Sequence, residues 1–290
     1  MQIGIGLGTS MLQNGLKWAL YAGGVQATMD IDFLSGRVKN GTVPSLVETM
    51  LACARATPAA AYYLNNDLTL SSYAANTLRY GTRGLLVESS RVNLCLQSQT
   101  FDNASWTKTR VTATADQAAA PDGTTTADFL KEDATATSTH LATQSITITT
   151  AAYAWSLYVK PNGRTWIAID ANDGTPRLTY FNLAGAGTVG TNAAGNTSTI
   201  AALANGWYLC TVTRTAAATG GAFTVYLASA DNTNSYSGDN ASGVYLWGAQ
   251  NELGAFPSSY IPTTTASVTR AADVVTFSDL TWFDGAAETI

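Results

Sequence analysis

Between about residue 125 and residue 277 the sequence repeats one pattern, in which short runs of β-branched and aromatic residues are separated by turn residues. Pro-Asp-Gly at 121–123 and Pro-Asn-Gly at 161–163 are such turns, because Pro presets φ and Gly accepts a positive φ. Many short, evenly spaced strands are typical of a β-sandwich or jelly roll. No long helical periodicity interrupts them, which excludes a parallel α/β sheet. The predicted strands are 126–132, 139–148, 153–160, 165–170, 177–182, 197–202, 207–215, 222–228, 243–252 and 267–277.

Two of these strands show which faces are buried. In 153–160 the large apolar side chains alternate, so that one face of the strand is apolar. The strand 207–215 is apolar on both faces, which predicts a central position in a sheet. In Trp247-Gly248-Ala249, two small residues permit close packing beside a large indole. The predicted fold class is therefore all-β, an antiparallel β-sandwich of the jelly-roll type.

Charge is scarce in this chain, because charged residues make up 12% of its 290 residues and the net charge is −5. The 15 Lys and Arg residues are scattered singly, and phosphate binding needs them clustered. Nucleic acid is thus not expected as a partner. Three widely spaced cysteines, Cys53, Cys95 and Cys210, predict free buried thiols with no disulfide framework.

The first 27 residues differ from the rest, because they are apolar and rich in Gly. Because they lack a basic start and a continuous apolar run, we expect them to be neither a signal peptide nor inserted in a membrane. We therefore expect the protein to be made in the host cytoplasm. Such a terminus is a candidate docking peptide, and the alternative is that it folds back on its own domain. The candidate anchoring residues are Ile3, Ile5, Leu7, Leu12, Leu16 and Trp18.

We expect residues 28–93 to form a smaller anchor or collar region that is mostly irregular or β. It contains a strand at 29–33, a hairpin at 62–70 around Asn-Asn-Asp, and a short strand at 85–88, whereas 46–56 is predicted helical or irregular. The sandwich is assigned to residues 94–277. Residues 278–290 are either a tail that packs on the sandwich or the start of a further domain.

Several motifs in one order resemble structural proteins of bacteriophage particles. The motifs are RGLLVE at 83–88, RVNL at 91–94 followed by Ser98, Phe101 and Trp106, APDGTTTAD at 120–128, GWY at 206–208, LWGAQNE at 246–252, SYIPT at 259–263 and TRAAD at 269–273. The chain resembles the family of phage head-fibre, tail and minor structural proteins. The resemblance implies a central domain similar to the concanavalin-like, galactose-binding-like jelly rolls of carbohydrate-binding modules.

Sugar binding needs an aromatic ring face flanked by amides and carboxylates. The loop 231–240 has this composition, with Tyr236 flanked by Asn234 and Asp239, and Trp166 with Asp173 is a second choice. The alternative for such polar loops is that they are ordinary solvated turns.

No cofactor is predicted, apart from a structural calcium for which Asp128 and Asp273 are candidate ligands. The single histidine, His140, has no acidic neighbour in sequence and is expected at the surface or half-buried. Glycosidase chemistry would need a pair of carboxylates. The candidates are Glu132, Asp170, Asp173 and Glu252.

These observations predict a non-enzymatic virion protein, either a fibre, a decoration or a tail component. It would attach to other virion proteins through its N-terminus, associate with itself as a trimer, and present the sandwich outward. The first alternative is an adhesin that binds host surface polysaccharide. The second alternative is a polysaccharide depolymerase.

Overall fold

The computed structural model describes residues 21–22, 25–26, 29–32, 37–40, 43–46, 51–55, 61–81 and 83–277. The predicted docking peptide, with Ile3, Ile5, Leu7, Leu12, Leu16 and Trp18, lies outside the described residues, and so does the predicted tail 278–290. The only helix within the described ranges is the single 3-10 turn Ala204–Gly206. No described helix has the length and apolar character needed to cross a membrane.

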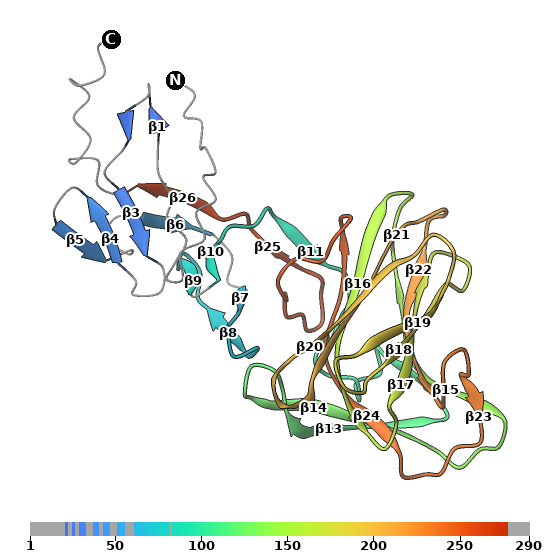
Figure 1. The fold of residues 1–290 in the computed structure, drawn as a ribbon. Coiled ribbons are helices and arrows are strands. Elements are labelled where there is room, and N and C mark those ends of the chain that lie inside the picture. The colour runs from blue at the N-terminus through green and yellow to red at the C-terminus, as the bar shows by residue number, and fades with distance from the viewer. Residues whose placement is uncertain are drawn as a thin grey trace.

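Two antiparallel sheets stacked face to face form the larger part of the molecule (Figure 1). Sheet 1 has the order β13-β14-β24-β16-β21-β20, with bounds Val111–Ala119, Thr125–Glu132, Gly243–Leu253, Ala152–Asn162, Tyr208–Thr215 and Thr197–Ala202. Sheet 2 has the order β12-β15-β22-β17-β18-β19, with bounds Thr107–Thr109, Ser138–Ile146, Gly221–Ala228, Trp166–Asn172, Leu178–Asn182 and Thr188–Asn192. The short β23, Ser235–Tyr236, also pairs with β15.

The strand order within the sheets is that of a jelly roll. The chain passes from β14 to β15, β16 and β17 by changing sheet each time, and again from β21 to β22 and β24. As a result β14-β24-β16-β21 faces β15-β22-β17-β18, and all the pairings within both sheets are antiparallel. The predicted all-β sandwich is confirmed.

Alternating side chains from the inner faces of both sheets fill the core. Tyr153, Trp155, Leu157 and Val159 of β16 all belong to it, as the alternation in the sequence predicted. The facing side chains of sheet 2 include Ile167, Ile169, Phe181, Val225 and Leu227, each fully buried. Strand β21 pairs with a neighbour on each side, which confirms its interior position.

The predicted strands match the observed ones closely between β14 and β24, but the prediction failed at several places. Strands β12, β13 and β19 were not predicted. The predicted strand 267–277 is divided into β25, Val268–Arg270, and β26, Val274–Phe277. The segment 46–56, predicted helical or irregular, contains the strand β6.

The N-terminal part consists of short paired strands. They are β1 Tyr21–Ala22, β2 Val25–Gln26, β3 Met29–Asp32, β4 Arg37–Asn40, β5 Val43–Leu46, β6 Leu51–Ala54, β7 Ala61–Leu64, β8 Leu70–Tyr73, β9 Arg79–Gly81, β10 Gly84–Leu86 and β11 Arg91–Asn93. Strands β7 and β8 form the predicted hairpin. The smaller N-terminal region is thus β, as expected.

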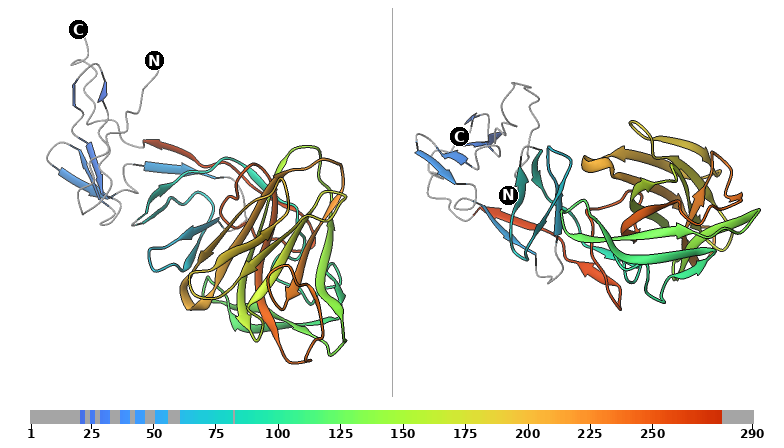
Figure 2. Two further views of the ribbon diagram at one scale, coloured as in Figure 1. Left: turned by 45° about the vertical axis from the view of Figure 1, so that its right-hand side comes forward. Right: turned by 90° about the horizontal axis from the view of Figure 1, so that it is seen from below.

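The end of the described chain returns to this N-terminal part. Strand β25 pairs with β11, and β26 pairs with β6 (Figure 2). Strand β26, which the sequence analysis assigned to the sandwich 94–277, lies outside both of its sheets. The chain enters and leaves the sandwich through adjacent strands.

A β-bulge in β24 shifts the register of its pairing with β16. Between the pairs Ser156↔Gln250 and Tyr158↔Trp247, one residue of β16 faces two of β24. Gly248 in the bulge has φ +65, and a Cβ at this position would lie 2.8 Å from the Tyr158 ring. Both backbone conformation and close packing therefore require glycine.

We expect Gly248→Ala to lower the free energy of unfolding by about 2 to 5 kcal/mol, from left-handed strain and overpacking together. Gly123→Ala is the matched control, because Gly123 has φ +84 but nothing within 4 Å of a built Cβ. It should lose only about 1 to 2 kcal/mol. Urea unfolding of both variants measures the difference, and equal losses would contradict the packing argument.

Candidate functional site

The hairpin β7–β8 covers part of the outer face of sheet 1. Tyr62 and Leu70 from the hairpin pack with Tyr158, Trp247 and other side chains that point away from the main core. The rings of Tyr62 and Trp247 meet edge to face with centroids 5.9 Å apart. This second apolar cluster attaches the N-terminal part to the sandwich.

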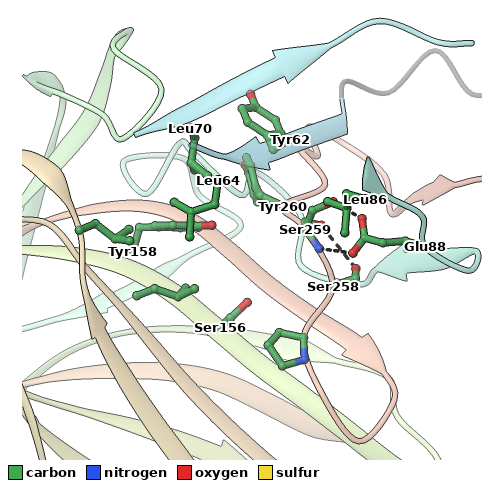
Figure 3. Close-up of a pocket in the computed structure, with 13 residues that line it drawn as sticks. Tyr62, Leu64, Leu70, Leu86, Glu88, Ser156, Tyr158, Ser258, Ser259 and Tyr260 are labelled. Atoms are coloured by element: carbon green, nitrogen blue, oxygen red, sulfur yellow. Dashed lines mark hydrogen bonds between the residues drawn. The ribbon is translucent and has the colours of Figure 1, made fainter. Parts of the chain in front are cut away.

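A cavity of about 240 Å³ remains between the hairpin and the sheet (Figure 3). Its lining is Tyr62, Leu64, Leu70, Leu86, Glu88, Ser156, Tyr158, Leu203, Leu209, Pro257, Ser258, Ser259 and Tyr260. Ligand pockets usually measure roughly 300–1,000 Å³. The cavity is smaller than this, and its walls are mostly apolar, so we interpret it as incomplete packing at the junction.

Beside the cavity lies a network of buried charges that joins the two parts. Arg79 of β9 donates to Glu88 at 2.7 Å and to Asp273 at 2.5 Å. Arg55, which follows β6, donates to the other oxygen of Asp273 at 2.8 Å. Arg270 of β25 donates to Glu88 at 2.8 Å. The three Arg side chains are wholly buried.

Ser259 and the backbone complete this network, which we call the junction network. The Ser259 N–H and hydroxyl donate to the two Glu88 oxygens at 2.8 and 2.6 Å. The Glu88 N–H donates to Asp273 at 2.9 Å, and the Asp273 N–H donates back to the Glu88 carbonyl. The network thus holds together residues 185 positions apart in the chain.

Both carboxylates of the junction network are held in their charged forms. Burial alone would raise the pKa of Glu88, but Arg270, the Ser259 hydrogen bonds and Arg79 bring it below its ordinary value. Burial likewise opposes ionisation of Asp273, yet the bonds from Arg55, the Glu88 N–H and Arg79 lower its pKa. Burial lowers the pKa of the Arg270 guanidinium.

The sequence motifs that carry the resemblance contain most of the residues of the junction network. Glu88 ends RGLLVE, Ser259 begins SYIPT, and Arg270 and Asp273 belong to TRAAD. Asn93 of RVNL donates to the carbonyls of Ala249 and Ile261 at 3.0 and 2.8 Å. Arg55 and Arg79 lie outside the motifs, and nothing in the sequence marked them. The motif residues therefore act as structural residues that connect the two parts.

The loop 231–240, a predicted sugar-binding loop, is fixed by side-chain contacts inside the fold. Tyr236 is buried, with 9% of its surface exposed, and its hydroxyl donates to Glu132 at 2.7 Å. The Arg164 guanidinium stacks over its ring at 4.7 Å and also binds Glu132. Stacking on a sugar would need an exposed ring, but the Tyr236 ring is buried and anchors the loop.

The other two candidate sugar-binding residues of the loop 231–240 are Asp239 and Asn234. Asp239 is exposed, but its carboxylate accepts from the Ser242 hydroxyl at 2.6 Å and from the Ser242 and Ala241 N–H groups at 2.7 and 2.8 Å, which lowers its pKa. Asn234 lies half-buried in the same loop, beside β23. The Asp239 carboxylate therefore shapes the turn.

Trp166 and Asp173, the second predicted sugar-binding pair, are not brought together by the fold. Asp173 is buried and pairs with Arg214 at 3.1 Å and with Arg177 at 3.6 Å. Trp166 lies at the opposite end of β17, half-buried on the outer face of sheet 2. Tyr180 and Tyr226 share that face with it, and sequence reasoning missed both.

The two calcium candidates are occupied by hydrogen-bond donors. Asp128 accepts backbone N–H groups of Phe101, Asp102 and Asp116, and burial raises its pKa to about 6. Asp273 lies between two guanidinium groups, as described above. N–H donors thus occupy the oxygens of both carboxylates, and the described residues contain no group of three or more His, Cys, Asp or Glu side chains that could hold a metal ion.

The catalytic candidates are also structural. His140 is fully buried, not at the surface, with Asp133 at 3.4 Å and the Tyr236 ring stacked at 4.7 Å. Glu132 binds Arg164, and Asp170 accepts from the Arg177 N–H at 2.5 Å. Glu252 is buried and accepts from Ser258. Each carboxylate that was considered for glycosidase chemistry is thus engaged within the fold.

Neither a family model nor a curated protein sequence matches this chain. The resemblance to phage structural proteins therefore depends on the ordered motifs alone.

We expect Asp273→Ala to lower the free energy of unfolding by about 3 to 5 kcal/mol, because two buried guanidinium groups lose their shared partner. The exposed Asp102→Ala is the control and should change stability by no more than about 0.5 kcal/mol. Denaturant unfolding gives both values. A loss below about 1 kcal/mol for Asp273→Ala would show that the junction does not depend on this carboxylate.

Acid should remove the stabilisation that Glu88 provides. Its pKa is lowered in the folded state, so its contribution is complete above the ordinary value of 4.5 and disappears as the pH falls through the lower, folded value. The stability difference between the native protein and Glu88→Gln should therefore be largest near pH 7 and narrow below pH 4.5. Thermal unfolding at a series of pH values tests this, and a constant difference would refute it.

Proposed function

We propose that this protein is a non-enzymatic structural component of a bacteriophage particle. In this proposal the N-terminal region mounts the molecule on other virion proteins, the jelly roll points outward, and the protein associates with itself, as fibres do. The observation that carries the proposal is the junction network. Motifs that resemble those of phage structural proteins, far apart in this sequence, meet there and connect one part to the other.

The geometry of the junction supports a mechanical role. The chain enters the sandwich at β11 and leaves it at β25, and these two strands pair with each other. Strand β26 then pairs with β6. The chain thus enters and leaves the sandwich as paired strands, and buried ion pairs link Arg55 and Arg79 to Glu88 and Asp273 beside them. Such a connection suits a protein that projects from a particle on its N-terminal part.

The engagement of the buried carboxylates argues against the depolymerase alternative. Glu132 and Glu252 hold side chains and loop N–H groups of their own fold, and neither lines the junction cavity. A general acid or nucleophile must instead face a substrate-sized space. The adhesin alternative has support from the outer face of sheet 2, which carries aromatic residues.

Particle association tests the proposal. Purified phage particles probed with an antibody against this protein should contain it, and a variant lacking residues 1–27 should remain soluble but be absent from particles. The matched control is Phe256→Ala, which alters a side chain exposed by 63% and should be incorporated normally. Normal incorporation of the truncated protein would refute docking through residues 1–27. Absence of the native protein from particles would refute the virion assignment itself.

A further inference from the structure

Strand β13 is the outermost strand of sheet 1 and forms an open edge (Figure 1). Among the described strands it pairs only with β14. The other edge strand of the same sheet, β20, differs from it, because the Ser198 hydroxyl bonds to Thr179 of β18 and Asn192 of β19. Sheet 2 therefore closes that side of the sandwich. An open edge leaves backbone N–H and C=O groups to which another strand can bind.

The hydrogen-bond pattern shows which groups of β13 face the open edge. The Asp133 N–H donates to the Arg110 carbonyl, so Arg110 and every second residue after it bond to β14. Main-chain groups alternate in direction along an antiparallel pair, so Val111 and Ala113 face outward. No described residue bonds to the N–H or C=O groups of these two residues. Four main-chain groups are thus free within one short stretch.

The regular part of this edge lacks the features that usually prevent pairing with another chain. Natural edge strands carry Lys, Pro or a bulge for this purpose. Residues 111–114 read Val-Thr-Ala-Thr, and the bulge lies after them, where Asp116 has φ 58. Thr112 and Thr114 are exposed on the outer face of the sheet. Short β-branched side chains of this kind favour a neighbouring strand.

The free groups are complementary to themselves under a two-fold axis at Thr112. When two copies of β13 run antiparallel about this residue, Val111 of each copy lies opposite Ala113 of the other. Four main-chain hydrogen bonds then form, two for each such pair. Thr112 lies opposite its own counterpart, and Thr–Thr pairs across strands are stabilising. The two copies of sheet 1 would join into one continuous sheet.

The charges at the two ends of the edge favour the same orientation. Arg110 precedes the regular part, Asp116 follows it, and both are exposed. Neither side chain forms a salt bridge with a described residue. The two-fold axis places Arg110 of each copy opposite Thr114 of the other, two residues from Asp116. Opposite charges therefore approach each other twice, which argues for a second copy of this chain as the partner.

We propose that residues 110–116, which we call the β13 edge, pair with the β13 edge of a second copy to form a two-fold dimer. The inference assigns a surface to the self-association in the proposed function and rests on that function in this respect alone. The pairing predicts a dimer, whereas we expected a trimer from the sequence. Residues 111–114 take no part in the junction network, so the dimer leaves the attachment of the N-terminal part unchanged.

Light scattering of the full-length protein after gel filtration, at a series of concentrations, measures the mass. The native protein should have twice the monomer mass. Thr112→Lys should raise the dissociation constant about tenfold or more, because two lysines then lie directly opposite each other. Thr199→Lys, which changes an exposed Thr of the other edge strand β20, is the matched control and should dimerise normally. A monomeric or trimeric native protein, or dimers unaffected by Thr112→Lys, would overturn the proposal.

Charge reversal tests the orientation of the two strands. Arg110→Asp and Asp116→Arg should each weaken the dimer, because like charges then approach each other. An equimolar mixture of the two variants should recover it, since both contacts are again between opposite charges. A mixture no tighter than the single variants would refute the antiparallel register.

A cross-link tests the two-fold axis. Thr112→Cys should form a disulfide-linked dimer on mild oxidation, because the two Cα atoms of this pair lie about 4.5 Å apart, within disulfide range. Thr199→Cys should not, and equal cross-linking of both variants would overturn the assignment. Particle incorporation of Thr112→Lys is measured separately. A monomer in particles refutes only the dimer, and a dimer absent from particles refutes only the virion assignment.

Discussion

The arrangement of this protein depends on a small group of charges that are removed from water together. Arg55, Arg79 and Arg270 would each be costly to bury alone, and Glu88 and Asp273 offset that cost only when all the segments that carry them are in place. The ion pairs therefore specify one relative position of β6, β9, β25 and the Ser259 loop. Apolar packing of the hairpin on sheet 1 supplies area, but the ion pairs fix the register.

Turn residues and the alternation of apolar and polar side chains were enough to predict the sandwich, because both are local properties of the sequence. The central strands carry large apolar residues on alternate positions, and Gly-containing turns separate them. Strand β13 was missed because its Ala and Thr residues form a half-exposed edge with weak patterning. Strand β6 was missed because it is short and its partner β26 lies more than two hundred residues away in the chain. Only the folded chain brings such pairs together.

The candidate sites were harder to predict, because burial is decided by tertiary contacts. Tyr236 lies in a polar loop whose composition suits a binding site, yet Glu132 and Arg164 hold it from below. The opposite happened to Tyr226, which stays partly exposed on the outer face of sheet 2, whereas Tyr180 on the same face is buried. Each occupies a strand whose other face is core, so the sequence is apolar throughout, and a fully buried strand has the same pattern.

The two outer faces of the sandwich explain how structure and function divide in this molecule. Both are apolar, which is unusual for antiparallel sheets with one face in a core. On sheet 1 the hairpin and the junction network cover that surface, and the face is used for attachment within the chain. On sheet 2 the side chains of β17, β18 and β22 pack against one another, so that Ala168, Tyr180 and Ala228 are buried without a covering hairpin. The two outer faces therefore differ in what packs on them, and only the face of sheet 1 is used to attach the N-terminal part.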